Sequence, residues 1–205
     1  MDKRALIAQF DEGSKDVVLR VDANSELEKF PHRIAELSGS YDTDRQFLLD
    51  NRTHEGIAGY HVLTPFMLAG TDSGVFVNRG WLPVGASRDI LPEVSVTTAP
   101  VTVIGTIAPV PRVFLLGGSG HDSSDWPRVV QSVDWTPMEA ALGKRLLRAQ
   151  ILLGVDQPDG YERAWTAYYG ISPERHQAYS VQWYGLALTL LVLYMVVSVK
   201  RGRSI

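Results

Sequence analysis

A long uncharged stretch near the C-terminus constrains this chain more than any other feature. Residues 181–199 contain no Asp, Glu, Lys or Arg, and Lys200, Arg201 and Arg203 follow directly. As an α-helix at about 1.5 Å per residue, this stretch would extend about 28 Å, close to the thickness of bilayer hydrocarbon. Thr189 is tolerated there because a small hydroxyl can bond back to the helix. The sequence therefore predicts one transmembrane helix; the alternative, a buried core helix, leaves the basic tail unexplained.

The charges that flank the stretch predict its orientation. Three cations follow it and only Arg175 lies close before it, a bias that favours a cytoplasmic C-terminus. The body would then lie on the outer side, although the sequence opens with Met1-Asp2-Lys3-Arg4 and no apolar run that could act as an export signal. We therefore expect a membrane helix upstream of Met1. A tail-anchored protein with a cytoplasmic body is the competing interpretation.

The composition narrows the class of the body. Residues 1–172 are enough for one domain with a substantial core. A net charge of −3 without a basic stripe argues against nucleic acid as a partner. The chain contains no Cys, which excludes disulfides, thiolate metal sites and haem attached through cysteine. The predicted organisation is an extramembrane domain (1–172), an interfacial and transmembrane helix (173–199) and a basic cytoplasmic tail (200–205).

Short runs rich in β-branched residues, separated by Gly, Pro, Asn and Asp, are typical of an antiparallel sheet. A weak helical pattern over residues 25–37 is interrupted by Pro31, and a stronger one covers residues 136–142, with Thr136 as N-cap and Glu139 completing a capping box. The predicted fold class is therefore α+β: a β-rich antiparallel extramembrane domain with few helices, followed by one C-terminal transmembrane helix. The predicted strands are residues 17–21, 57–63, 75–77, 101–107 and 148–155.

The start of the predicted C-terminal helix carries a candidate metal ligand. With Ser172 as N-cap and Pro173 in the first turn, His176, Tyr179 and Trp183 fall on one helical face. The positive end of the helix dipole disfavours the imidazolium, and neutral imidazole is the form that binds metals. A flat, lipophilic, metal-bearing ring could dock on this face. The alternatives are an aromatic belt that only anchors the helix and an ordinary interfacial histidine.

Several segments, taken together and in this order, resemble the surfeit locus protein 1 family, which assists the assembly of cytochrome c oxidase. The resemblance covers nearly the whole chain, and Ser180 and Tyr184 are mild departures where alanine and phenylalanine are usual. The segments are Gly39-Ser40-Tyr41-Asp42, Leu49-Asp50-Asn51-Arg52, residues 56–65, Val75-Phe76-Val77-Asn78-Arg79-Gly80-Trp81-Leu82-Pro83, and Arg175-His176-Gln177-Ala178-Tyr179-Ser180-Val181-Gln182-Trp183.

The resemblance implies a bacterial inner-membrane protein with a helix at each end and a periplasmic body, here without the first helix. It also implies binding of haem a and help with its insertion into the catalytic subunit of the oxidase, with His176 as iron ligand and Tyr179 and Trp183 beside it. That subunit, a haem a synthase and the lipid bilayer are the expected partners, and no enzymatic activity is expected.

Two further motif residues are candidates for contact with haem a. Arg79 offers a planar fork suited to a carboxylate, either of a protein Asp or of a haem propionate, and structural pairing is the favoured use. Trp81 is either a core residue or the wall of a cavity. Gly59 and Gly80 are expected to supply backbone freedom at bends. Three histidines without a partner at metal-ligand spacing are expected at the surface or in the core: His54, His61 and His121.

Three functions stay open at the level of sequence. The first is a non-enzymatic assembly factor that holds haem a at the membrane surface and presents it to the oxidase. The second is a protein-contact scaffold for oxidase assembly without a direct role in haem binding. The third and most remote is a membrane-anchored hydrolase that uses Ser119 and His121 of the Gly-rich loop 117–124, although this segment lacks the strand-turn-helix pattern of a nucleophile elbow.

Overall fold

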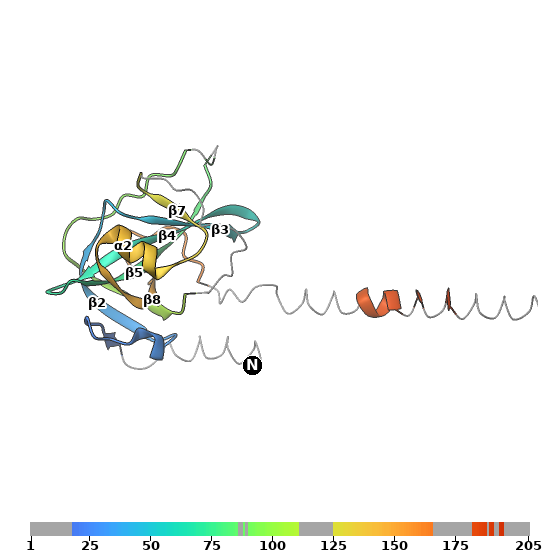
Figure 1. The fold of residues 1–205 in the computed structure, drawn as a ribbon, viewed down its shortest axis with the longest axis horizontal. Helices are drawn as coiled ribbons and strands as arrows, with labels where there is room; N and C mark the ends of the chain where they lie inside the picture. The colour runs from blue at the N-terminus through green and yellow to red at the C-terminus, as the bar shows by residue number, and fades with distance from the viewer. Residues whose placement is uncertain are drawn as a thin grey trace, which may run out of the picture. The chain divides into compact units, whose positions relative to one another are not determined.

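The computed structural model describes residues 18–85, 88, 90–110, 125–165, 182–187, 189–190 and 193–194. The chain divides into two compact units, one of Ala8–Thr166 and one of Met1–Ile7 with Ala167–Ile205. The larger unit contains, in chain order, β1 (Leu19–Arg20), η1 (Leu27–Lys29), β2 (Ile34–Tyr41), β3 (Phe47–His54), β4 (Ile57–Leu68), β5 (Ser73–Pro83), β6 (Val101–Ala108), β7 (Arg128–Val130), α2 (Trp135–Leu142) and β8 (Arg145–Leu153) (Figure 1).

The strands of the larger unit form one mixed sheet in the order β1-β2-β6-β8-β5-β4-β3-β7, with an additional pairing between β2 and β4. Because β2 pairs with both β6 and β4, the strands β2, β6, β8, β5 and β4 form a closed ring of pairings. The predicted antiparallel sheet is only partly right, since β1–β2, β3–β7 and β5–β8 are parallel. The long connection from β5 to β8 allows the crossover that a parallel pair requires.

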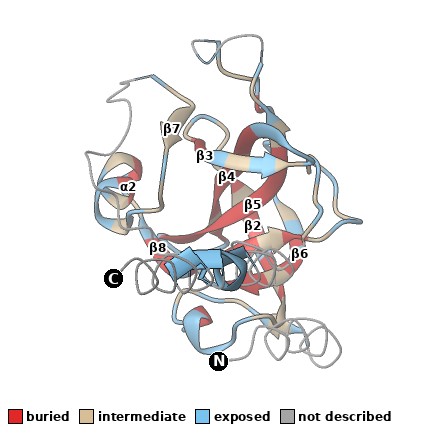
Figure 2. Ribbon diagram, turned by 90° about the vertical axis from the view of Figure 1, so that its right-hand side faces the viewer, coloured by how far each residue is buried: buried red, intermediate tan, exposed pale blue. Residues whose placement is uncertain are grey.

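The inside of this ring is the main hydrophobic core. Each strand of the ring contributes to it, because alternate residues along a strand face the same side. Leu37, Phe66, Val77, Ile107 and Ile151, one from each of the five strands, are at most 1% exposed, and the buried strands are drawn in red in Figure 2. Burial of such apolar surface is the dominant favourable contribution to folding.

A second core lies under α2, where Met138 and Leu142 pack with Phe47, Phe76 and Leu146. These partners come from β3, β5 and β8. The helix ends at Gly143, which adopts a left-handed conformation with φ 62°. Glycine tolerates this conformation at a helix end because it has no Cβ.

The capping residues predicted for this helix are wrong. Asp134 rather than Thr136 is the N-cap, and its carboxylate accepts a hydrogen bond from the Thr136 N–H at 3.3 Å. Asp caps a helix at least as well as Thr, and the N-cap lies two residues earlier than predicted, so the helix begins at Trp135. Glu139 does not complete a capping box. Its carboxylate accepts from the Leu146 N–H at 2.8 Å and from Arg148 at 2.9 Å, and so joins α2 to β8.

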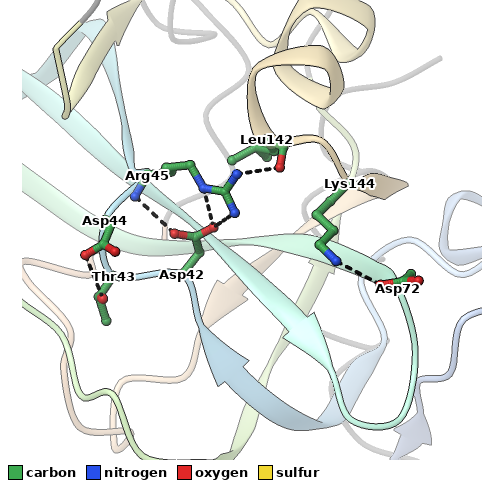
Figure 3. Close-up of polar contacts among 7 residues, drawn as sticks. All are labelled: Asp42, Thr43, Asp44, Arg45, Asp72, Leu142 and Lys144. Carbon is green, nitrogen blue, oxygen red and sulfur yellow. Dashed lines mark hydrogen bonds and ion pairs between the residues drawn. The ribbon is translucent and has the colours of Figure 1, made fainter.

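Two basic side chains fix the C-terminal end of α2 (Figure 3). Arg45 pairs with Asp42 at 2.7 Å and donates to the carbonyl of Leu142. Lys144, just beyond the helix, contacts Asp72 of the β4–β5 turn at 2.8 Å. Cations at a helix C-terminus are favoured by the helix dipole. Asp42 belongs to one of the segments that carry the family resemblance, and it therefore has a structural role.

The helix predicted over residues 25–37 is wrong. The structure has the short 3₁₀ helix η1 and then β2, in which Ala35 and Leu37 face the core. Pro31 disfavours a continuous helix, and pairing of β2 with β6 and β4 overrides the local helical preference. β3 is not among the predicted strands, because its second half is polar. The strands predicted in the regions of β4, β5, β6 and β8 are confirmed with shifted ends.

In the smaller unit, residues 182–187, 189–190 and 193–194 are helical. The Thr189 hydroxyl donates to the Gly185 carbonyl at 2.9 Å, which confirms the expected back-bond. Among the residues that the structure describes, no helix combines the length and apolar character needed to cross a bilayer. Much of the predicted span 181–199 lies outside the described residues, so the transmembrane helix stays a prediction.

Candidate functional site

Three of the segments that carry the family resemblance lie side by side in the sheet, although they are separated in sequence. They occupy β3, β4 and β5, which are neighbours in this order (Figure 1). In the register of the strands, Leu49 is opposite His61, and His61 is opposite Trp81. The structure therefore brings the central motif residues of the larger unit together on three adjacent strands.

The pairings of β4 with β3 and with β5 are each interrupted by a bulge at this place. On one side, the register steps from Leu49–His61 to Arg52–Gly59, so two residues of β3 oppose Tyr60. On the other side, it steps from Leu63–Asn78 to His61–Trp81, so Arg79 and Gly80 together oppose Val62. Bulges redirect side chains and are frequent near functional sites. The bulged residues of β3 and β5 thus belong to two of the segments that carry the family resemblance.

Each bulge contains a residue with positive φ. Asn51 has φ 58°, and Gly80 has φ 117°. A Cβ on Gly80 would lie 2.6 Å from the Glu162 carbonyl oxygen. The prediction that Gly80 supplies backbone freedom at a bend is confirmed. Gly59 has a different role, because a Cβ there would lie 2.4 Å from the Trp81 ring.

Arg79 is 1% exposed, so the bulge places a guanidinium inside the body. Its Nε donates to the Asp159 carbonyl at 2.7 Å, and its Nη2 donates to the Ser95 carbonyl at 2.6 Å. Its Nη1 donates to Gln46 Oε1 at 3.1 Å. Longer contacts reach Thr64 Oγ1 (3.4 Å) and the Tyr161 hydroxyl (3.5 Å). In the described part of the chain these five acceptors are all neutral oxygens.

The rings of Tyr161 and Tyr41 also contact this guanidinium, with centroids 4.9 and 5.9 Å from Cζ. Burial lowers the pKa of Arg79, and Tyr161 and Tyr41 oppose that shift. Burial also raises the pKa of Tyr41 to about 12, against the opposing effect of Arg79. A buried cation is costly unless hydrogen bonds and rings surround it. For Arg79 to contact an external carboxylate, that carboxylate would have to displace one of the five protein oxygens that accept hydrogen bonds from the guanidinium.

Trp81 is buried as well, at 9% exposure. Its indole N–H donates to the Arg52 carbonyl at 3.0 Å, and its ring centroid lies 5.2 Å from that of His54. Its backbone exchanges two hydrogen bonds with Glu162, at 2.7 and 3.2 Å. Of the two roles predicted for Trp81, these contacts favour the core residue. Contact of Trp81 or Arg79 with haem a stays a prediction that this geometry does not favour.

His61 belongs to a row of polar side chains that crosses β4, β5 and β8. Asn78 Nδ2 lies 3.2 Å from His61 Nδ1 and donates to Gln150 Oε1 at 3.1 Å. The Gly80 N–H donates to Asn78 Oδ1 at 3.2 Å, which sets the orientation of that amide. His61 Nδ1 is therefore an acceptor, and the neutral ring carries its proton on Nε2. In this tautomer His61 is a hydrogen-bond donor at Nε2 rather than a metal ligand.

Burial, with smaller contributions from the nearby Arg52 and His54, lowers the pKa of His61 to about 4. Because the folded pKa lies below the ordinary value of 6.5, the unfolded chain binds more protons between pH 6.5 and 4. Stability should therefore fall by roughly 2–3 kcal/mol as the pH falls through this window, and should not change through His61 above it.

The measurement is denaturant unfolding of the full chain at pH 7 and pH 4.5, for the wild type and His61→Asn. The Asn oxygen can accept from Asn78 but does not titrate, so the variant should lose less stability on acidification. Equal losses in the two proteins would show that His61 is not the group responsible.

A groove among the described residues lies away from this region. It has a volume of about 630 Å³ and is lined by residues that include Leu27, Ile107, Trp135 and Arg148. Arg148 is paired with Glu139 at 2.9 Å and lies over the Trp135 ring at 5.2 Å. The groove contains none of the motif residues of β3, β4 or β5. The described residues also include no group of three or more His, Cys, Asp or Glu that could hold a metal.

Three of the five residues predicted to contact haem a, His176, Tyr179 and Trp183, belong to the smaller unit. His176 and Tyr179 lie outside the described residues, as do Ser119 and His121 of the remote hydrolase hypothesis. Trp183 lies in the described helix, where its side chain is 69% exposed. Tyr184, Leu190 and Tyr194 of the same helix are also largely exposed. The described part of this helix therefore presents an apolar and aromatic surface without charged side chains.

Sequence reasoning did not identify the buried polar residues Gln46, Thr64, Asn78 and Gln150, or the partly buried Tyr161, as hydrogen-bond partners. Thr64, Asn78 and Gln150 interrupt otherwise apolar strands, and a polar residue in such a place usually has a hydrogen-bond partner inside the fold. That pattern could have indicated a buried network. It could not have indicated that Arg79 is its centre.

The family comparison agrees with the resemblance noted in the sequence. The model of the SURF1 family matches residues 1–188, and the chain belongs to this family. No curated protein matches the chain. Membership is consistent with a role in the assembly of cytochrome oxidase and with a protein that is not an enzyme.

Proposed function

We propose that this member of the SURF1 family is a membrane-anchored assembly factor that holds haem a as cargo and aids its insertion into the catalytic subunit of cytochrome c oxidase. The observation that carries the haem proposal is the exposure of the described helical residues 182–187, 189–190 and 193–194, which include Trp183. Family membership supports the assembly role.

The described residues fit a flat, lipophilic ring. Trp183 offers an exposed aromatic plane, and the residues around it are uncharged. His176 precedes Trp183 by seven residues, which is about two helical turns and thus the same face of a continuous helix. We assign His176 as the iron ligand and Tyr179 and Trp183 as the apolar contacts. Arg79 and Trp81 are not assigned as contacts, because both are buried within the body.

A carrier must hold its cargo but also release it. One axial histidine and apolar contacts suit this task better than two strong iron ligands. Haem a can then be released to a receiving site that offers the iron more ligands. Neutral imidazole is required for iron binding, and a position in the first turn of a helix favours that form. The chain's own contribution is to orient one imidazole beside an aromatic surface.

The uncharged helix and the basic residues after it support a location in the bacterial inner membrane, with the body in the periplasm and the C-terminus in the cytoplasm. The partners that we propose are lipid, the catalytic subunit of the oxidase and a haem a synthase. Protection of the body from added protease in intact spheroplasts would contradict this orientation.

The haem assignment is tested by purifying the full chain from cells that make haem a. The wild type should carry the absorption bands of haem a, and His176→Ala should lose most of the pigment. His54→Ala is the control, because His54 packs on Trp81 in the body and should leave the pigment in place. Full retention of haem a by His176→Ala would remove the site assignment.

A further inference from the structure

The last described segment of the larger unit, residues 159–165, lies along the bulge of β5. The Tyr161 N–H donates to the Arg79 carbonyl at 2.7 Å. The Trp81 N–H donates to the Glu162 carbonyl at 2.7 Å, and the Glu162 N–H donates back at 3.2 Å. The motif backbone on both sides of Gly80 therefore forms a short antiparallel pairing with this segment.

The Arg79 side chain holds the same segment from inside the body. Its Nε donates to the Asp159 carbonyl at 2.7 Å, and its guanidinium lies 4.9 Å from the Tyr161 ring. Its other donors reach Gln46, next to β3, and the carbonyl of Ser95. One buried side chain thus joins residues 159–161 to two other parts of the fold.

Further contacts extend this fixation to Trp165. Arg163 Nη1 donates to the carbonyls of Gly154 and Gln157, at 2.6 and 2.7 Å. The Trp165 indole donates to the Leu153 carbonyl at 2.7 Å, and its ring lies edge-on to His61 at 5.9 Å. No part of the 159–165 segment belongs to the described helices or to the named strands, so its order depends on these contacts.

The geometry points to a clamp. Arg79, Gly80 and Trp81 fix the 159–165 segment, from which the chain continues toward His176, so that the haem-binding segment leaves the body from a fixed place. Gly80 is required because the Glu162 carbonyl occupies the space of a Cβ. In this arrangement Arg79 acts on haem delivery through the backbone that it holds and not through contact with a propionate. The consequence for haem delivery rests on the proposed function; the clamp itself does not.

The test is hydrogen exchange, measured by mass spectrometry on the full chain in detergent micelles. Arg79→Met removes the side-chain contacts, and Glu162→Pro removes the single N–H that Glu162 donates to Trp81. Leu37→Ala is the matched control, since Leu37 is fully buried in the ring core and makes no part of the clamp. The expected result is at least tenfold faster exchange in residues 159–165 in the first two variants, relative to β6 in the same molecule, and no such local difference in Leu37→Ala.

Spin labels give a second readout if Arg79→Met folds poorly. The chain has no Cys, so labels on Ala140→Cys in α2 and Ala164→Cys report only on these exposed positions. Glu162→Pro should broaden the distribution of distances between them. If Glu162→Pro gave the same distance distribution and the same exchange pattern as Leu37→Ala, the clamp would be overturned.

The haem readout separates the clamp from the proposed function. Haem a retained by His176→Ala removes the haem assignment but leaves the exchange result standing. Haem a lost from Arg79→Met with unchanged exchange in residues 159–165 would identify Arg79 as a haem contact and overturn the clamp. Faster exchange with haem a still bound supports the clamp.

Discussion

Arg79→Lys is expected to destabilise the larger unit by about 3–5 kcal/mol, although the substitution keeps the positive charge. The acceptors of Arg79 lie on different edges of a planar fork, with the Asp159 carbonyl at Nε and the Ser95 carbonyl at Nη2. An ammonium has its three donors on one atom and cannot reach both carbonyls. The variant would therefore keep the cost of a buried charge and lose the hydrogen bonds that offset it.

Arg79→Met is expected to cost less than Arg79→Lys, by roughly 1–2 kcal/mol. It leaves the same carbonyls without their donors, at about 1–3 kcal/mol for each buried group, but it also removes the charge whose burial is unfavourable. The measurement is denaturant unfolding of both variants in the same detergent. The opposite order, in which Arg79→Lys keeps its stability and Arg79→Met loses several kcal/mol, would show that the positive charge itself matters. That is the result expected if Arg79 contacted a haem propionate.

Gly80→Ala is expected to lose about 3 kcal/mol of stability. A non-glycine residue at φ 117° is strained by roughly 1–3 kcal/mol. In addition, the new Cβ would lie 2.6 Å from the Glu162 carbonyl oxygen, so the pairing of Trp81 with Glu162 must open. The effect combines backbone strain with the loss of about two hydrogen bonds at about 1 kcal/mol each.

Gly56→Ala provides the matched control. Gly56 also has positive φ, at 84°, but a Cβ there would meet no atom within 4 Å. Its substitution should cost only the backbone strain, about 1 kcal/mol. Unfolding midpoints of the two variants in one denaturant series give the comparison. Equal losses would show that the contact with Glu162 contributes nothing.

Local sequence patterns predicted much of the sheet but not its closure. The apolar runs in β4, β5, β6 and β8 indicate strands, because β-branched residues and turn signals lie within a few positions of one another. The helical pattern over residues 25–37 wrongly predicts a helix where β2 begins. The strand character of β2 depends on its pairing with β6, which begins 60 residues after β2 ends. The parallel pairing of β5 with β8 depends on similarly remote residues and on a connection that contains α2.

The environment of Arg79 could not be predicted for the same reason. Its two shortest hydrogen bonds go to backbone carbonyls that are 16 and 80 residues away in sequence. Carbonyl acceptors leave no signature in the side chains of Ser95 or Asp159. The sequence could indicate only that an arginine fork suits a planar acceptor, and it favoured structural use. The role of His61 as a partly buried, neutral side chain likewise depends on Asn78 and Gln150 from neighbouring strands.

The central claim is that the chain serves oxidase assembly by presenting haem a from His176. The most direct measurement is the haem a bound to cytochrome c oxidase, from reduced-minus-oxidised spectra of membranes of a strain that lacks this gene. Wild-type protein should restore the oxidase signal, and His176→Ala, present at the same level, should restore only a small part of it. Equal restoration by the two proteins would contradict the account and would favour a scaffold that acts without binding haem.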